Sequence, residues 1–370
     1  MTEPLKTLIQ TRIRQDILSM HAYAIQDSAG LVKLDAMENP HRLPADLQRQ
    51  LGERLGQLAL NRYPDGRVND LRASLAAYAD MPAGYDIMLG NGSDELISLL
   101  ALACDVPGAV VLAPLPGFVM YAMSAQLQGL QFVGVDLTAD FELDVPAMLA
   151  AIARYKPAIT YLAYPNNPTA NLWDDAAMAQ IIAAVADIGG LVVVDEAYQP
   201  FSSKTYLDTI RAHPVAHSHV LLMRTLSKFG LAGVRLGYML GPKALIAEVD
   251  KVRPPYNISV LNYECALFAL EHKEVFKSQA GVLIAQRAML LDKLSKIEQL
   301  KAYNSDANMI LVRVLGQGST ATASFEGMKA QGVLVKNVSK MHPLLANCLR
   351  LTVGTADENL RLLAALEKSL

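Results

Sequence analysis

Three short runs of apolar residues constrain the fold of this chain more than any other feature. They are residues 159–163, 191–194 and 220–223, and they consist mainly of Val, Leu, Ile and Ala. A continuous run of this length is typical of a strand buried on both faces, as in a parallel sheet covered by helices. Polar side chains follow each run, and the carboxyl ends of parallel strands meet at one edge of the sheet. The runs therefore predict an α/β fold with a functional site at that edge.

Lys228 follows the third run, in the sequence RTLSKFGLAGVR of residues 224–235. A lysine just past a buried strand end is partly desolvated, which lowers its pKa and frees the amine to form Schiff bases with carbonyls. Thr225 and Ser227 offer hydroxyls, and the planar guanidinium of Arg235 suits a phosphate. A Schiff-base lysine beside a phosphate anchor predicts a pyridoxal phosphate site. From this segment alone, a lysine on a solvated turn is the alternative.

Asp195 follows the second run and begins the sequence DEAY of residues 195–198. A carboxylate at the end of a buried strand needs a cationic partner. The protonated nitrogen of a pyridine ring would be such a partner, and the carboxylate would keep the ring electron-poor. Asn167, which follows the first run, and the Tyr198 phenol are candidates for hydrogen bonds to the ring hydroxyl. Asn167, Asp195 and Lys228 thus follow three successive predicted strands.

Residues 90–95 read GNGSDE and offer an anion site. Gly92 allows a tight turn, and Ser93 is expected to cap a helix that begins at Asp94. Free N–H groups at a helix start and the positive end of the helix dipole favour a phosphate. The segment lacks the Gly-Lys-Ser/Thr ending of a P-loop and the third glycine of a dinucleotide-binding turn. We therefore expect a phosphate seat at residues 92–94, with an ordinary capped helix as the alternative.

Composition favours a two-lobed cytoplasmic protein. The 370 residues exceed the ~100–200 residues of a typical domain, and 52% of them are hydrophobic, which supports a large core. A formal net charge of −3 argues against binding to nucleic acid. Three scattered cysteines indicate reduced thiols, and residues 1–16 lack the apolar core of a signal peptide. No apolar run approaches membrane-spanning length, and no metal site is expected, because His213, His217 and His219 lack acidic or Cys ligands beside them.

The remaining patterns place the other elements and the lobes. Strands are expected near residues 110, 132, 159, 191, 220 and 236 of a large lobe and near 310, 333 and 350 of a smaller one. Helices are expected at residues 46–61, 94–103, 174–186, 244–252 and 275–300 and from Asp357 onward. The alternation of strands and helices favours a mostly parallel sheet. Prolines within residues 253–257 break the chain between the lobes. We predict an arm at 1–45, a large domain at 46–258 and a small domain at 259–370.

Seven stretches of the chain carry a resemblance to a known family. They are LDAMENP at 34–40, RYPD at 62–65, GNGSDE at 90–95, PNNPT at 165–169, VDEAY at 194–198, RTLSK at 224–228 and LRLTVG at 349–354. In this order they resemble the fold-type I pyridoxal-phosphate-dependent aminotransferases and, within them, the histidinol-phosphate aminotransferase family. The resemblance covers almost the whole chain. It implies a large lobe with a mostly parallel seven-stranded sheet and a smaller α+β lobe that the N-terminal arm joins.

The resemblance also implies roles that spacing alone does not show. Phe118 matches an aromatic residue that stacks on the cofactor ring, with a core position as the alternative. Tyr63 matches a tyrosine that reaches the phosphate of the neighbouring subunit's cofactor, which implies a homodimer with shared active sites. Arg350 matches a clamp for substrate anions, with a surface ion pair as the alternative. The candidates for binding substrate are Tyr23, Asn257, Lys336 and Arg350. For Tyr23, an N-terminal arm that merely packs is the alternative.

In the resembled family the reaction is transamination between L-histidinol phosphate or imidazole-acetol phosphate and 2-oxoglutarate or L-glutamate, a step of histidine biosynthesis. Lys228 would be the catalytic residue that moves the proton. Two positions depart from the family pattern, with Ala170 in place of the usual glycine and Lys336 in place of a frequent arginine. The open alternatives are a threonine-phosphate decarboxylase, an aromatic amino acid aminotransferase of the same fold, and a non-catalytic module that binds a ligand.

Overall fold

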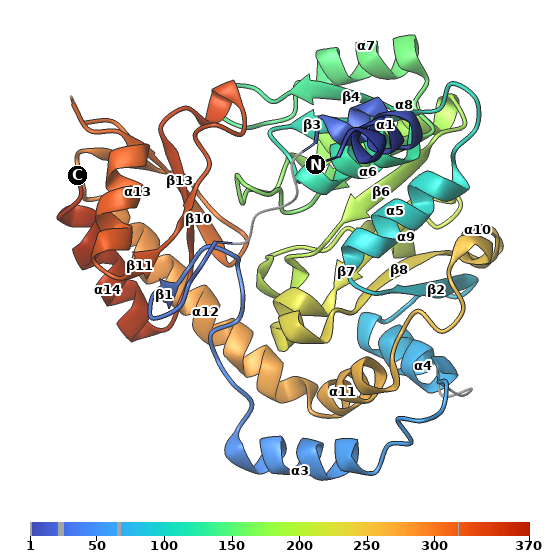
Figure 1. Ribbon diagram of the computed structural model, residues 1–370, viewed down its shortest axis with the longest axis horizontal. Helices are drawn as coiled ribbons and strands as arrows, with labels where there is room; N and C mark the ends of the chain where they lie inside the picture. The colour runs from blue at the N-terminus through green and yellow to red at the C-terminus, as the bar shows by residue number, and fades with distance from the viewer. Residues whose placement is uncertain (1, 21–25, 65–67, 317) are drawn as a thin grey trace.

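A seven-stranded sheet forms the centre of the larger lobe in the computed structural model, which describes residues 2–20, 26–64, 68–316 and 318–370 (Figure 1). Its strands are β2 (Tyr85–Gly90), β3 (Val110–Leu115), β4 (Gln131–Asp136), β5 (Ile159–Ala163), β6 (Leu191–Asp195), β7 (Val220–Thr225) and β8 (Gly237–Pro242). The strand order is β2-β8-β7-β6-β5-β3-β4. Strands β3 to β7 pair in parallel, whereas β8 runs antiparallel to both of its neighbours. The predicted α/β fold with a mostly parallel sheet is confirmed.

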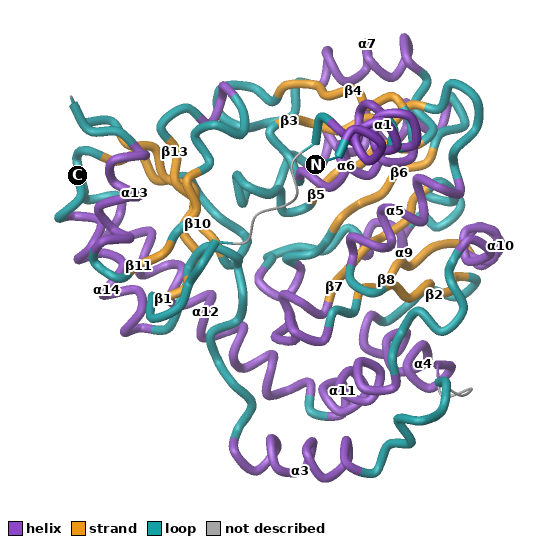
Figure 2. Tube along the Cα trace, in the orientation of Figure 1, coloured by secondary structure: helices purple, strands orange, loops and turns teal. Residues whose placement is uncertain are grey.

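Helices cover both faces of this sheet, because its central strands are apolar on both sides. Along β6, Val192 and Val194 pack into one core cluster, and Val193 packs into a second cluster on the opposite face. Figure 2 shows these strands between layers of helices. The first cluster takes residues from α4 (Val68–Ala79), α7 (Val145–Tyr155), α8 (Asp175–Asp187), α9 (Leu207–Ala212) and α11 (Val260–Glu271). The second takes residues from α5 (Ser93–Ala103), α6 (Val119–Gln128) and α10 (Lys243–Val249).

The smaller lobe is built on an antiparallel sheet of order β12-β13-β10-β9. Its strands are β9 (Leu300–Ala302), β10 (Met309–Val314), β12 (Lys336–Asn337) and β13 (Cys348–Thr352), and its helices are α12 (Lys273–Leu294), α13 (Ala321–Ala330) and α14 (Ala356–Glu367). In the N-terminal arm, β1 (Val32–Lys33) pairs in parallel with β11 (Val333–Leu334), so the arm is attached to this lobe. The remaining helices are α1 (Glu3–Arg12), α2 (Gln15–Leu18) and α3 (Ala45–Gly56).

The domain boundaries remain a proposal. Helix α11 belongs to the small domain if the division falls after residue 258, yet it packs against α3 and α4 and shares the core of the large sheet. Helix α12 continues from there into the smaller lobe, where it packs against β9, β10 and α14 (Figure 1). These contacts favour a division within α12 over one at residue 258.

Several predicted elements differ from the structure at their ends. The helix expected at 46–61 ends at Gly56, and the one expected at 275–300 ends at Leu294, before β9. Strand β2 was not among the strands expected from the sequence, because Asp86 interrupts its apolar residues. In the fold, Arg72 donates to Asp86 Oδ1 at 2.5 Å, an ion pair with α4 that makes the acidic residue compatible with the strand.

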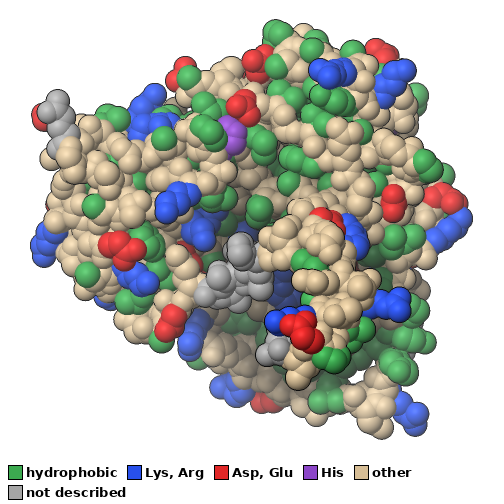
Figure 3. Space-filling model, turned by 45° about the horizontal axis from the view of Figure 1, so that its top comes forward, with side chains coloured by type: hydrophobic (Ala, Val, Ile, Leu, Met, Phe, Trp, Pro, Cys, Tyr) green, Lys and Arg blue, Asp and Glu red, His purple; other side chains and the backbone are tan. Residues whose placement is uncertain are grey.

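The surface mixes charges of both signs. On the face drawn in Figure 3, Lys and Arg side chains are interspersed with Asp and Glu side chains, and hydrophobic atoms lie between them. Over the parts of the chain that the structure describes, no helix combines the length and apolarity needed to cross a membrane.

Candidate active site

Three side chains from adjacent strands face one cavity at the carboxyl edge of the large sheet. Asn167 follows β5, Asp195 is the last residue of β6, and Lys228 lies on a π-helical turn after β7. The cavity is lined by Met37, Ser93, Asp94, Phe118, Tyr121, Ala163, Pro165, Asn167, Asp195, Ala197, Tyr198, Thr225, Ser227, Lys228 and Arg235. The structure therefore brings together every predicted cofactor-binding residue except Gly92 and Tyr63.

The amine of Lys228 is buried, although the residue as a whole is only half-buried. Its Nζ donates to the Ala36 carbonyl oxygen at 2.9 Å and lies 5.9 Å from the centroid of the Tyr198 ring. Burial, followed by the positive charge of Arg350, lowers the pKa of the amine from 10.5 to about 8. Near neutral pH, a much larger fraction of this amine is unprotonated than in an exposed lysine, and the unprotonated form is the nucleophile.

Asp195 is a buried carboxylate whose hydrogen-bond donors are neutral. Its Oδ2 accepts from the Tyr121 hydroxyl at 2.6 Å, and its Oδ1 accepts from the Ala197 backbone N–H at 3.0 Å. Burial raises the pKa of the carboxyl to about 6, and these two donors limit the increase. A buried anion of this kind is stabilised further by a cation that enters the cavity.

The anion seat lies at the start of α5. Gly92 has a φ of 85°, in the left-handed region that favours glycine, and a Cβ there would lie only 2.7 Å from Nη2 of Arg235. Arg235 donates to Ser227 Oγ at 3.2 Å and to Asp94 Oδ2 at 3.3 Å. The Arg235 guanidinium, the Ser227 hydroxyl and the start of α5 therefore lie next to one another, an arrangement that suits a phosphate.

The predicted capping role of Ser93 is wrong. Gly92 occupies the N-cap position, Ser93 is the first helical residue, and within the described parts of the chain the helix start has no side-chain cap hydrogen bond. The physical reason is the glycine turn, which moves the helix start one residue back from Asp94. The N–H groups at the start of α5 can consequently bind a phosphate without displacing a capping side chain.

Arg350 joins the smaller lobe to the cavity. It lies on β13 with only 8% of its surface exposed. Its Nη1 donates to Asn167 Oδ1 and its Nη2 to the Asp35 carbonyl oxygen, both at 2.8 Å. The burial of this side chain does not fit the alternative of a surface ion pair, and both of these partners are uncharged oxygens.

The lining of this cavity does not include Lys336, Asn257 or Tyr63. Lys336 lies on β12, where it pairs in register with Arg350 of the adjacent strand β13, and it is half-buried. Asn257 donates to Glu95 Oε2 at 2.7 Å and accepts from Arg253. Tyr63 is 77% exposed and stacks on Tyr256, with 4.7 Å between the ring centroids. Tyr23 lies outside the described residues.

Residues 29–366 match the family model described as "Aminotransferase class I and II". The chain belongs to this aminotransferase family. Among curated relatives, the histidinol-phosphate aminotransferase of Polaromonas naphthalenivorans is 74% identical over 100% of both chains. The histidinol-phosphate aminotransferase of Methylibium petroleiphilum is 67% identical over 98% of this chain and 96% of its own. The predicted family resemblance is confirmed.

A solved structure shares the fold. The histidinol-phosphate aminotransferase from Sinorhizobium meliloti, in complex with pyridoxal-5'-phosphate, superimposes with a TM-score of 0.82. The alignment covers 97% of each chain at 23% sequence identity. At this identity the likeness establishes the architecture of the aminotransferase and does not by itself assign a ligand.

One cavity residue was missed by the sequence reasoning. Tyr121 belongs to α6, and its hydroxyl reaches Asp195 across the sheet edge. Phe118 is the non-helical N-cap residue of α6, and no local pattern links Tyr121 to Asp195, which lies 74 residues further along the chain. The Phe118 and Tyr121 rings meet edge to face, with 5.6 Å between their centroids.

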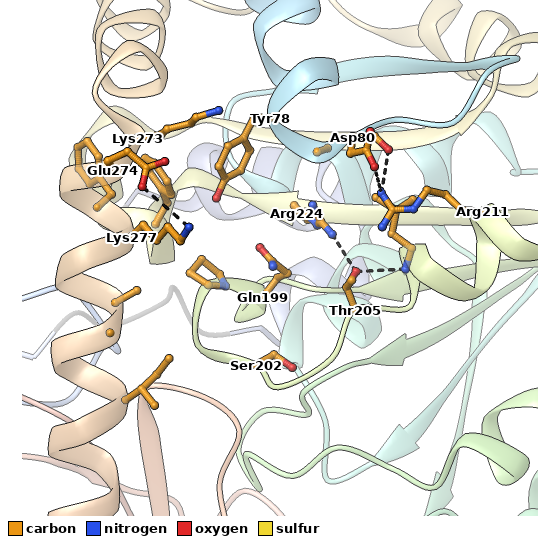
Figure 4. Close-up of a pocket in the computed structure, with 18 residues that line it drawn as sticks. Tyr78, Asp80, Gln199, Ser202, Thr205, Arg211, Arg224, Lys273, Glu274 and Lys277 are labelled. Carbon is orange, nitrogen blue, oxygen red and sulfur yellow. Dashed lines mark hydrogen bonds and ion pairs between the residues drawn. The ribbon is translucent and has the colours of Figure 1, made fainter.

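A larger cavity of about 680 Å³ lies between α12, the end of α4 and the loop after β6 (Figure 4). Lys228 does not line this cavity. Most charged side chains around it pair with one another or with buried acids. Arg211 contacts Asp80 at 2.6 Å, Lys277 lies 3.9 Å from Glu274, and Arg224 is bonded to the buried Glu196. The candidate active site is therefore the smaller cavity, which Lys228 lines. Among the residues with described positions, no three His, Cys, Asp or Glu side chains could together hold a metal ion.

The depressed pKa of Lys228 predicts how its reactivity depends on pH. In the cofactor-free protein, the amine is mostly protonated below pH 8 and becomes nucleophilic as the pH rises through about 8. Lys228 is acylated with a limiting amount of an anhydride at pH values from 6 to 11, and the rate is measured by peptide mass spectrometry. This rate should be half-maximal near pH 8. The exposed Lys368 in the same digest corrects for reagent reactivity. A midpoint above about pH 10 would contradict the effect of burial.

Proposed function

We propose that this aminotransferase, with pyridoxal 5'-phosphate as cofactor, transfers the amino group of L-histidinol phosphate to 2-oxoglutarate. The products would be imidazole-acetol phosphate and L-glutamate, and the reaction is a step of histidine biosynthesis. The observation that carries the proposal is a desolvated lysine amine and a buried carboxylate on adjacent strands of one cavity that also holds an anion seat. The names of relatives that are 74% and 67% identical support the substrate pair.

The donor set of the cavity fits this cofactor. The start of α5, Ser227 and Arg235 would hold the phosphate, and Thr225, which bonds to Ser227 Oγ at 3.0 Å, would support them. Asp195 would pair with the ring nitrogen. Asn167 and Tyr198 would bond the ring hydroxyl, and Phe118 would cover one face of the ring. When bound, pyridoxal phosphate supplies an aldehyde that carries the amino group and a ring that accepts electron density from the substrate carbon.

The side chains divide the chemical work. The unprotonated Nζ of Lys228 would hold the aldehyde carbon and, when released, move a proton to and from the substrate carbon that bears nitrogen. Asp195 would keep a positive charge on the ring nitrogen, because a buried carboxylate favours a cation beside it. The Asn167 side-chain oxygen accepts a hydrogen bond from Nη1 of Arg350, and this bond would orient the guanidinium toward the substrate.

Arg350 would bind the anionic groups of both substrates, since one guanidinium can pair with a carboxylate or a phosphate through two parallel bonds. Lys336, in register with it on β12, adds positive charge beside this clamp without the planar fork. Tyr23 and Asn257 remain proposed substrate contacts. In this chain Asn257 is engaged with Glu95 and Arg253.

We also propose a homodimer with shared active sites. Tyr63 is largely exposed and does not line the cavity of its own chain, which fits a side chain that reaches the cofactor phosphate of a second copy. Its stacking on Tyr256 holds the ring at the surface. The other partners would be the small-molecule substrates and not nucleic acid. Free thiols at Cys104, Cys265 and Cys348 fit a location in the reducing cytoplasm.

The function is tested by half-reactions of the cofactor-loaded protein. Mixing it with L-histidinol phosphate or L-glutamate should remove the visible absorbance of the bound cofactor, and Lys228→Ala should abolish both reactions. Release of carbon dioxide from threonine phosphate would instead identify a decarboxylase. Faster reaction with phenylalanine than with histidinol phosphate would identify an aromatic aminotransferase.

Substitution of Arg350 tests the anion clamp. Arg350→Ala leaves a desolvated substrate anion unpaired, which costs about 2–5 kcal/mol, so kcat/KM should fall for glutamate and for histidinol phosphate. Arg350→Lys should recover only part of either, because an ammonium cannot make two parallel bonds. Arg361→Ala, on the exposed face of α14, is the matched control. Loss confined to glutamate would show that the phosphate is bound elsewhere.

Substitution of Tyr63 tests the shared site. Tyr63→Phe removes one hydrogen bond to a charged phosphate, worth about 1.5–3 kcal/mol, so dialysis should strip the cofactor faster than from the wild-type protein. Tyr155→Phe, a half-buried tyrosine at the end of α7, should leave retention unchanged. Analytical ultracentrifugation should find a dimer at assay concentration. A fully active monomer would refute the shared site.

A further inference from the structure

We propose that Tyr121 is a positioning residue, whose hydroxyl fixes the orientation and the ionised state of Asp195 toward the ring nitrogen. This inference rests on the proposed function, because it concerns the carboxylate that the cofactor would pair with. The sequence assigned no role to Tyr121. Its assignment comes from three features of the structure, namely the hydrogen bond to Asp195, the packing of the phenol ring and the charges near the carboxylate.

The hydrogen bond occupies one of the two carboxylate oxygens. Tyr121 donates to Oδ2 at 2.6 Å, while the Ala197 backbone N–H holds Oδ1 at 3.0 Å. One donor on each oxygen fixes the plane of the Asp195 carboxylate. The remaining lone pairs can then accept from a donor inside the cavity. The Ala197 donor belongs to the backbone and cannot be removed by substitution, so the orientation can be varied through Tyr121.

The phenol ring has little freedom to move. Tyr121 is only 3% exposed, and its ring stacks on Tyr161 with 4.3 Å between centroids and 6° between planes. Its edge contacts the ring of Phe118, the residue proposed to cover the cofactor. Stacked and edge-to-face aromatic pairs restrict orientation. Tyr121 therefore contacts both Phe118, which would cover the face of the cofactor ring, and Asp195, which would pair with the ring nitrogen.

The charges near Asp195 explain why a donor is needed. Burial raises the pKa of the carboxyl, and the negative charges of Asp94 and Glu196 raise it further. The Tyr121 hydroxyl acts in the opposite direction because it stabilises the ionised form. Burial and the neighbouring carboxylate also raise the pKa of Tyr121 well above 10, so its hydroxyl keeps its proton and remains a donor across the physiological range. Without this hydroxyl, Asp195 would protonate more readily and would pair less well with a ring cation.

The substitution Tyr121→Phe removes the hydroxyl and keeps the stacked ring. In protein loaded with ¹⁵N-labelled pyridoxal phosphate and no substrate, the ring-nitrogen resonance should move toward the value of the unprotonated ring. In the half-reactions, kcat should fall roughly ten- to a hundredfold, the effect of one hydrogen bond to a charged group, with little change in KM.

The matched control is Tyr161→Phe. It removes the hydroxyl of the stacked partner, which is buried and has no hydrogen-bond partner among the described residues. This control should leave the ring-nitrogen resonance and kcat unchanged, and circular dichroism should show that both variants remain folded. If Tyr121→Phe matched Tyr161→Phe in both measurements, Tyr121 would be only a packing residue. The half-reactions of the wild-type protein with the different substrates test the proposed function separately, because the ring-nitrogen resonance is measured without any substrate.

Discussion

The buried carboxylate of Asp195 is the constraint on which this active site depends. It ends a strand whose residues face helices on both sides, so no water shell can stabilise its charge. The fold provides neutral donors and leaves the pKa raised to about 6. A carboxylate in this condition is paired best by a cation that binds in the cavity, and a protonated pyridine ring has the matching charge. Burial of this strand end therefore favours a cation in the cavity.

The Lys228 amine, which also faces the cavity, does not pair with the Asp195 carboxylate in any hydrogen bond among the described residues. Lys228 follows the adjacent strand, but its amine bonds to the Ala36 carbonyl oxygen of the N-terminal arm. The preceding carbonyl, that of Asp35, accepts from Arg350. Two consecutive carbonyl groups of the arm therefore hold both the reactive amine and the clamp of the smaller lobe. Under the proposed function, a substrate anion at Arg350 would compete with the arm for the same guanidinium, so the arm and the substrate would be linked through one side chain.

The parts of the site that the sequence predicted are those that local pattern determines. The runs before Asn167, Asp195 and Lys228 are almost entirely apolar, and such runs are typical of strands buried on both faces. The capping of α5 was assigned wrongly, because serine is a common N-cap and only the fold shows that Gly92 takes that position. Tyr121 was missed because its contact with Asp195 spans 74 residues of sequence. Residues that meet only through the tertiary fold leave no periodic signal in the chain.

The departure at Ala170 has a physical explanation in the same terms. Its φ of 65° lies in the left-handed region, where a side chain costs roughly 1–2 kcal/mol and glycine costs nothing. The residue is fully buried in a small core cluster with Met37, Tyr198 and Met309, so its methyl group removes apolar surface from water. Burial of one methyl group contributes about 0.8 kcal/mol, which offsets part of the strain. Backbone bonds from its N–H to Asn166 and from Asp306 to its carbonyl hold the strained conformation. Asn167 therefore keeps its place beside Arg350 without the glycine.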